Sequence, residues 1–139
     1  MKLVVFFAFF WAGSVSSISF MEAWLKFRVK GVTRPIGLSI GKKVFSALNK
    51  VEWALWLFFT VFYVIHIPLE LSGSLTLYTL ITIILILQSA YLYPMLNYRA
   101  NLIIDGKEPP KSRVHLINGI MEVAKVAMII ITGFLLIYG

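Results

Sequence analysis

The sequence has 139 residues, of which 60% are hydrophobic, and its mean hydropathy is +0.88. Ordinary globular domains are only about 45–50% apolar, so this composition excludes the common soluble classes and favours a polytopic membrane protein. The formal net charge of +7 does not indicate a nucleic-acid partner, because the basic residues are grouped between apolar stretches. The chain has no cysteine, which excludes disulfides, thiolate metal sites and cysteine nucleophiles.

Four apolar segments follow one another along the chain, and each is long enough to cross a bilayer as an α-helix. They are Leu3–Trp24, Val44–Ile67, Ser74–Leu96 and Val114–Tyr138. The first has features of a signal peptide, because Lys2 precedes it and Ser14, Ser16 and Ser17 are possible cleavage-site residues. Its apolar run continues through Met21, so we expect it to be retained as a span. The sequence therefore predicts an all-α four-helix membrane bundle that forms one domain over residues 1–139.

Charge asymmetry predicts the orientation of this bundle. The connection before and into the second span carries Lys26, Arg28, Lys30, Arg34, Lys42, Lys43 and Lys50, and the one after the third span carries Arg99, Lys107, Lys111 and Arg113. The segment Pro68–Gly73 has neither Lys nor Arg. Basic connections stay in the cytoplasm, so both termini are expected outside, with Lys2 a minor exception, in an integral protein of the bacterial cytoplasmic membrane.

Breakers and caps predict where the helices end. The second helix is expected to begin at Gly41, before the apolar span, because residues 41–48 have helical composition. The third is expected to continue past Pro94 to Ile104, so both helices extend into the cytoplasm. Pro94 should kink the third helix, and Gly106 should follow its last turn as the C′ residue. Ser112 is a plausible N-cap for the fourth helix. The motif Gly37–Gly41 matches G-x-x-x-G but is placed in the connection, where it has little value as a helix-dimer signal.

Polar residues recur at helical spacing in each span. The second span has a stripe of Asn49, Glu52, Trp56, Phe59, Tyr63 and His66, while Leu55, Phe58 and Phe62 on its other side suit lipid. The fourth has His115, Asn118, Glu122 and Lys125; the third has Gln88, with Arg99 11 residues later on the same face. The first has Glu22 and a ridge of small residues, Ala8, Ala12, Ser16 and Ser19, which allows close helix packing.

Lys125 is the most informative of these residues. It lies 11 residues after Val114, or about 16 Å along a helix, which is near the middle of a bilayer core about 30 Å thick. A charge at that depth costs roughly 2.5–3.5 kcal/mol and is a functional candidate by default. A purely structural alternative is also open, in which Glu122 and Lys125 form an ion pair one turn apart that fixes helix packing. Glu52 likewise has an interfacial interpretation, close to Lys50 and the headgroups.

Depth and phase together predict a polar nest in the cytoplasmic half of the bundle, with aromatic and aliphatic packing on the outer side. Its expected members are Glu22, Asn49, Glu52, Gln88, Arg99, His115, Glu122 and Lys125. Glu22, Asn49, Glu52, Arg99 and His115 are expected near the cytoplasmic boundary, with the other three deeper. Arg99 is alternatively placed in cytoplasmic solvent, or paired with Glu52 or Glu22.

The sequence does not carry the signature of an enzyme or of a cofactor site. It lacks H-x-x-x-H, a glycine-rich phosphate loop and a G-x-S-x-G elbow. His66 and His115 are expected at opposite membrane boundaries, so they cannot ligate one haem. A hard metal ion has Glu22, Glu52 and Glu122 as ligands only if their three helices converge. We therefore expect no catalytic activity, no metal and no cofactor.

The order of several motifs resembles a known family. These are the run from Glu22 to Phe27, the Asn49/Glu52 pair, the run from Tyr93 to Ala100 with its Asn97/Arg99 pair, Glu108-Pro109-Pro110, and the final helix with His115, Glu122 and Lys125. Together they resemble the transmembrane-protein-205-like family of small four-helix membrane proteins, distantly grouped with copper-resistance D-type proteins, and the resemblance covers most of the chain. It implies a four-helix fold and suggests metal or solute handling. The separated histidines and the lack of cysteine depart from a haem or copper site.

Three functions are compatible with these observations. The first is an accessory subunit that packs in a membrane assembly, with other membrane subunits or further copies of the chain as partners beside the bilayer. The alternative is proton, cation or small-solute handling through Glu22, Glu52, Glu122 and Lys125. A haem or quinone enzyme ranks third. A cytoplasmic cavity that reaches Lys125 favours the alternative, whereas a closed bundle with a direct Glu122–Lys125 pair argues against it.

Overall fold

The computed structural model describes residues 2–67 and 72–138, and their regular structure is entirely helical. The helices are α1 (Lys2–Leu25), α2 (Arg34–His66), α3 (Ser72–Leu87), a π-helical turn η1 (Gln88–Leu92), α4 (Tyr93–Ile104) and α5 (Val114–Tyr138). Because α3, η1 and α4 continue one another, the chain has four rods, each long and apolar enough to cross a membrane. The expected all-α fold with four candidate spans is confirmed.

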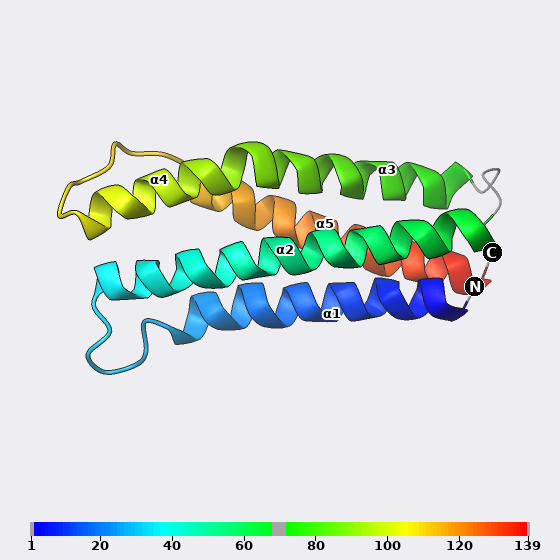
Figure 1. Cartoon of the computed structure of the whole chain (residues 1–139), viewed down its shortest axis with the longest axis horizontal. Coiled ribbons are helices and arrows are strands. Elements are labelled where there is room, and N and C mark those ends of the chain that lie inside the picture. The colour runs from blue at the N-terminus through cyan, green and yellow to red at the C-terminus, as the bar shows by residue number, and fades with distance from the viewer. Residues whose placement is uncertain (1, 68–71, 139) are drawn as a thin grey trace.

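The four rods form an up-down-up-down bundle (Figure 1). The connections 26–33 and 105–113 lie at one end, here called the loop end. The first turn of α1, the last turns of α2 and α5 and the start of α3 lie at the other, here called the terminus end. Helix α1 packs against α2 and α5, while the rod of α3, η1 and α4 packs against both α5 and α2. The four rods therefore close a ring around one core.

Helix α2 begins at Arg34, seven residues before the predicted start at Gly41. Thr33 is extended, and Pro35 occupies the first turn, where a missing N–H leaves no hydrogen bond unmade. Gly37 and Gly41 are therefore in the helix, and their expected place in the connection was wrong. Both are buried, and a Cβ on Gly37 would overlap the ring of Phe27. These glycines let the connection 26–33 fold back against α2.

Pro94 acts through η1. A regular helix would need an N–H at position 94 to bond to the carbonyl of Ala90, and proline has none. The chain instead widens by one residue before the proline, and the Tyr93 N–H bonds to the carbonyl of Gln88, five residues back. The predicted disturbance at Pro94 is thus a π-turn, which supplies the extra residue that a proline needs in a continuous rod.

The other predicted ends lie where expected. Helix α4 ends at Ile104, and Gly106 follows in the left-handed conformation with φ +76. The N–H groups of Gly106 and Lys107 bond to the carbonyls of Ile103 and Leu102 at 3.1 and 2.8 Å, which is the Schellman pattern. At the start of α5 the Ser112 hydroxyl accepts the Val114 N–H at 3.2 Å.

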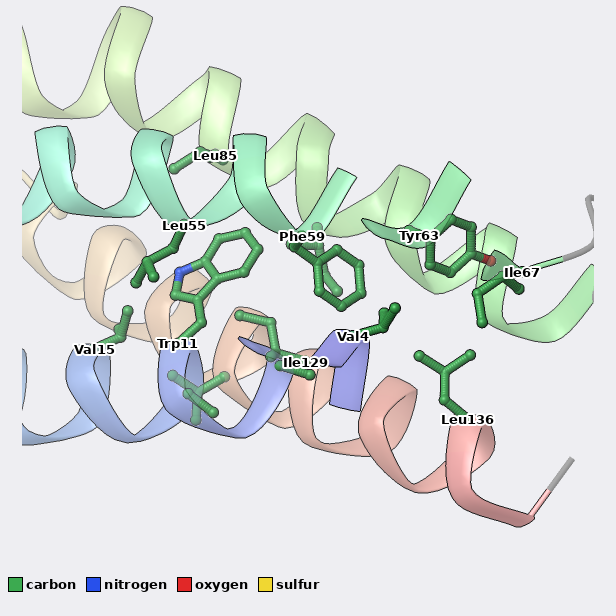
Figure 2. Packing of buried hydrophobic residues seen from close by; sticks show 14 of the residues in the cluster. Val4, Trp11, Val15, Leu55, Phe59, Tyr63, Ile67, Leu85, Ile129 and Leu136 are labelled. Carbon is green, nitrogen blue, oxygen red and sulfur yellow. The ribbon is translucent and has the colours of Figure 1, made fainter. Parts of the chain in front are cut away.

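The apolar core fills the terminus half of the bundle (Figure 2). The rings of Phe59, Tyr63 and Tyr78 stack with centroids 5.3–6.0 Å apart, which is the expected aromatic packing. Leu55 was expected to face lipid, but it is only 7% exposed, whereas Phe58 is 53% exposed. Leu55 follows Glu52 by three residues and therefore shares the inward face of α2.

We expect Gly106→Ala to lower stability by about 1–2 kcal/mol, because Ala at a left-handed φ strains the backbone. No atom would touch the new Cβ, so the backbone alone accounts for the loss. Gly13→Ala is the matched control, since its Cβ is equally free and its helical φ is ordinary. Thermal unfolding in detergent micelles measures both. Equal midpoints for the two variants would contradict the Schellman assignment.

Candidate functional site

Lys125 lies at the centre of a buried polar cluster. Its ammonium, fully buried, contacts Glu52 Oε1 at 2.5 Å, Gln88 Oε1 at 2.8 Å and Glu122 Oε2 at 3.2 Å. An ammonium has three N–H donors, and here each has an acceptor. The acceptors come from α2, η1 and α5, so this single side chain connects three of the four rods.

A second set of contacts orients these acceptors. The Gln88 amide donates to Glu122 Oε2 at 2.6 Å and to Asn118 Oδ1 at 3.2 Å. The fourth rod, α1, adds two donors, Ser19 to Glu122 Oε1 at 3.0 Å and Trp11 Nε1 to Glu52 Oε1 at 3.2 Å. In Figure 2 the Trp11 nitrogen points away from Tyr63 and Ile67, and so toward the loop end. The buried polar cluster consists of Trp11, Ser19, Glu52, Gln88, Asn118, Glu122 and Lys125.

The charges of the buried polar cluster do not balance. Two carboxylates, Glu52 and Glu122, face the single ammonium of Lys125, which leaves one negative charge in excess when both acids are ionised. Glu52 is fully buried, and its Oε2 has no hydrogen-bond partner among the described residues. The Tyr93 hydroxyl faces this carboxyl and likewise has no partner there, although its side chain is only 8% exposed. An unpartnered buried oxygen of this kind costs about 1–3 kcal/mol.

The π-turn explains how Gln88 and Tyr93 both reach the interior. Residues five apart in a regular α-helix point about 140° away from each other. The wider turn between them brings both side chains inward, and both are buried. π-Turns inside α-helices are often found at functional sites.

A cavity of about 240 Å³ lies on the loop side of the buried polar cluster. Its wall includes Lys26, Lys42, Asn49, Ser89, Tyr93, Asn97 and His115, and it lacks a carboxylate. Tyr93 belongs to this wall and also faces Glu52. Lys125, Glu52 and Glu122 are not part of the wall, so the cavity stops at Tyr93. The transport hypothesis expected a cavity that reaches Lys125, and this cavity does not.

The structure brings together half of the eight predicted nest residues. Glu52, Gln88, Glu122 and Lys125 are in contact. Glu52 was expected near the membrane boundary, but it lies at the level of Lys125. The boundary was placed at Val44, whereas α2 is a single helix of 33 residues that begins ten residues earlier. A stripe on a helix therefore predicts which side chains face inward better than it predicts their depth.

The other four predicted residues have different contacts. Glu22 pairs with Lys26, one turn later, at 3.0 Å. The amide oxygen of Asn49 accepts a hydrogen bond from Ser89 at 2.7 Å. Arg99 donates to the Pro110 carbonyl at 2.7 Å, and His115 is exposed at the cavity. Arg99 leaves the face of Gln88 because the π-turn between them shifts the helical phase by one residue, roughly 100°.

Sequence reasoning missed Trp11 and Tyr93 as polar contacts and gave Ser19 and Asn118 smaller roles. Ser19 belongs to the small-residue ridge of α1, and Asn118 to the stripe of α5. Trp11 and Tyr93 each carry one polar atom on a large ring, and both residues are counted as hydrophobic when apolar segments are identified. His66 and His115 lie at opposite ends of the bundle, at the end of α2 and in the first turn of α5, as expected.

Comparison with known proteins finds no relative: no family model, no curated protein and no solved structure matches the chain. The fold and the site thus define a class, a membrane protein of four long apolar helices around a buried ion cluster. The resemblance to the transmembrane-protein-205-like family stays a prediction.

We expect Lys125→Met to lower stability by about 3–5 kcal/mol, because it leaves two buried carboxylates without their cation. Neutralising the acids as well, in the triple variant Lys125→Met, Glu52→Gln and Glu122→Gln, should recover most of that loss. Denaturant unfolding in mixed micelles gives the free energies. A single variant as stable as the wild type would show that the ammonium does not hold the buried polar cluster together.

Proposed function

We propose that this chain is a proton-handling membrane protein whose buried polar cluster takes up one proton from the cytoplasmic side. The orientation rests on the basic residues of the connections 26–33 and 105–113, which favour the cytoplasm for the loop end. With this orientation both termini are outside, and the first turns of α2 and the last turns of α4 extend into the cytoplasm. The bacterial cytoplasmic membrane is the proposed location.

The excess negative charge of the buried polar cluster carries the proposal. A cluster that only fixes helix packing needs one acid for one lysine, and a second ionised acid in the same dry site is unfavourable. A proton on Glu52 Oε2 makes the cluster neutral. The same oxygen, which is an unpartnered acceptor when Glu52 is ionised, then becomes a hydrogen-bond donor. The groups that face this carboxyl are Lys125 and Glu122 on α5, Gln88 on η1 and Tyr93 on α4. From α1 it meets the neutral Trp11, whose indole N–H donates to it.

A proton suits this site better than a metal cation does. Hard cations such as Ca²⁺ take six to eight oxygen ligands. Most acceptor capacity of the buried polar cluster is already used by Lys125, Gln88, Ser19 and Trp11. What is left is one carboxylate oxygen beside one hydroxyl, which is room for a single proton.

Two features argue against the expected transport alternative and restrict the proposal to proton binding and release on one side. The Glu122–Lys125 pair is direct, and the cavity ends at Tyr93. The core between the buried polar cluster and the terminus end consists mainly of packed aromatic and aliphatic side chains (Figure 2), and the buried Tyr63 hydroxyl there is hydrogen-bonded to Ser74. We therefore propose exchange with the cytoplasm and not conduction through a pore. This agrees with the solute handling that the family resemblance suggests.

We expect infrared spectra of the purified protein at neutral pH to contain the band of a protonated carboxyl group that shifts in D₂O. Glu52→Gln should abolish this band, because it removes the protonated group itself. Glu22→Gln is the matched control, since Glu22 is an acid paired with a lysine outside the buried polar cluster, and it should keep the band. A folded wild type without any protonated carboxyl band would overturn the proposal.

An accessory subunit remains a second proposal because of one feature of the lipid-facing surface. A shallow apolar groove follows α5 beside α1 and is lined by Phe20, Leu116, Gly119, Ile120, Val123 and Ala127. Gly119 and Ala127 expose the helix backbone, which favours close approach of another transmembrane helix. The partner that this groove suits is a single apolar helix of another membrane subunit.

We expect Gly119→Leu to abolish co-purification of such a subunit after mild solubilisation, because the larger side chain fills the groove. Gly13→Leu, at an equally open position on α1, should leave it unchanged. Size-exclusion chromatography of both variants beside the wild type makes the comparison. A monodisperse wild-type chain without any partner would count against an accessory role.

A further inference from the structure

Tyr93 belongs both to the cavity wall and to the surroundings of the Glu52 carboxyl. It is 8% exposed, and its hydroxyl has no hydrogen-bond partner among the described residues. A phenol hydroxyl can donate one hydrogen bond and accept another, so it can face two partners at once. The hydroxyl faces the carboxyl of Glu52, and the same side chain lines the cavity.

We propose that Tyr93 is the gate through which the proton passes between the cavity and Glu52, an inference that rests on the proposed function. In this step the Tyr93 O–H bond breaks as its proton forms a new O–H bond on Glu52 Oε2. A hydrated proton (H₃O⁺) in the cavity gives its proton to the phenolic oxygen at the same time and becomes water, so Tyr93 ends as it began. The gain is one proton on Glu52, taken from the water of the loop end.

The other polar residues of the cavity wall that lie near the buried polar cluster are already engaged. Ser89 donates its hydroxyl proton to Asn49 at 2.7 Å and accepts the Trp53 indole N–H at 2.9 Å. Lys26 is paired with Glu22, and Lys42 donates to Asn101, both toward the loop end. His115 is exposed and lies in the first turn of α5. Tyr93, by contrast, faces Glu52 and its hydroxyl has no partner among the described residues, so it is placed to transfer a proton inward.

The π-turn is the element that puts Tyr93 in this position. Gln88 must point inward to hold Lys125 and Glu122, and Tyr93 must point inward to meet Glu52. Only the extra residue of η1 satisfies both, and Pro94 is the reason for it. The gate therefore depends on a residue that touches neither acid. Pro94→Ala, which allows a regular helix, should turn Tyr93 away from Glu52 although its hydroxyl is retained.

The test separates the rate of proton exchange from the amount of proton bound. Tyr93→Phe removes a single oxygen, so the protonated carboxyl band should persist while its exchange in D₂O slows by roughly tenfold or more. Pro94→Ala should slow the exchange similarly. Tyr98→Phe is the matched control on the same helix, because Tyr98 is 63% exposed, and it should exchange at the wild-type rate.

Two results would overturn the gate. One is that the carboxyl band of Tyr93→Phe exchanges in D₂O at the wild-type rate. The other is that Tyr98→Phe slows this exchange as much as Tyr93→Phe does. Circular dichroism and size-exclusion profiles establish whether each variant is folded. If Tyr93→Phe does not fold, the exchange rate of Pro94→Ala tests the gate in its place. A wild type that lacks the protonated carboxyl band refutes the proposed function itself. A wild type that has the band, with exchange indifferent to Tyr93, refutes only the gate.

Discussion

The contact of the Lys125 ammonium with Glu52, Gln88 and Glu122 is the interaction on which the bundle depends. Within a bilayer, apolar side chains gain little by leaving lipid for one another, so apolar packing alone specifies helix order and rotation weakly. A buried ammonium is different, because each of its donors must find an acceptor or incur the cost of a bare charge. The rods can satisfy Lys125 in one relative rotation and one relative height, which fixes both.

The buried polar cluster also divides the bundle into two unlike halves. Toward the termini, side chains such as Phe59, Tyr63 and Leu136 pack into an apolar core, and the buried Tyr63 hydroxyl is hydrogen-bonded to Ser74. Toward the loops, α2 and α4 leave a cavity whose wall combines apolar side chains with amides, hydroxyls and lysines. The excess negative charge lies where these halves meet. A group at such a boundary can exchange with one side of the membrane only, which is the basis of the function proposed above.

Much of this fold follows from the sequence, because long apolar runs and end signals are local. The four spans, the end of α4 at Ile104 and the left-handed Gly106 were all predicted from neighbouring residues. Helical phase also brought Glu52, Gln88, Glu122 and Lys125 to the interior. The start of α2 was missed because the helix was expected to begin at Gly41, whereas Gly41 lies inside it and Pro35 belongs to its first turn. The roles of Trp11, Ser19 and Tyr93 depend on contacts between rods, and a single helix does not reveal those.

The π-turn also has a consequence for how the third rod is built. An extra residue at η1 means that α3 and α4 run along one axis with independent helical phases. The side of α3 that meets lipid therefore does not continue into α4, and the faces of the two segments can change separately. Removing one residue from this stretch, or adding one, would rotate α4 as a unit while α3 keeps its place. The rod therefore consists of two helical segments with different helical phases, joined by the π-turn beside the buried polar cluster.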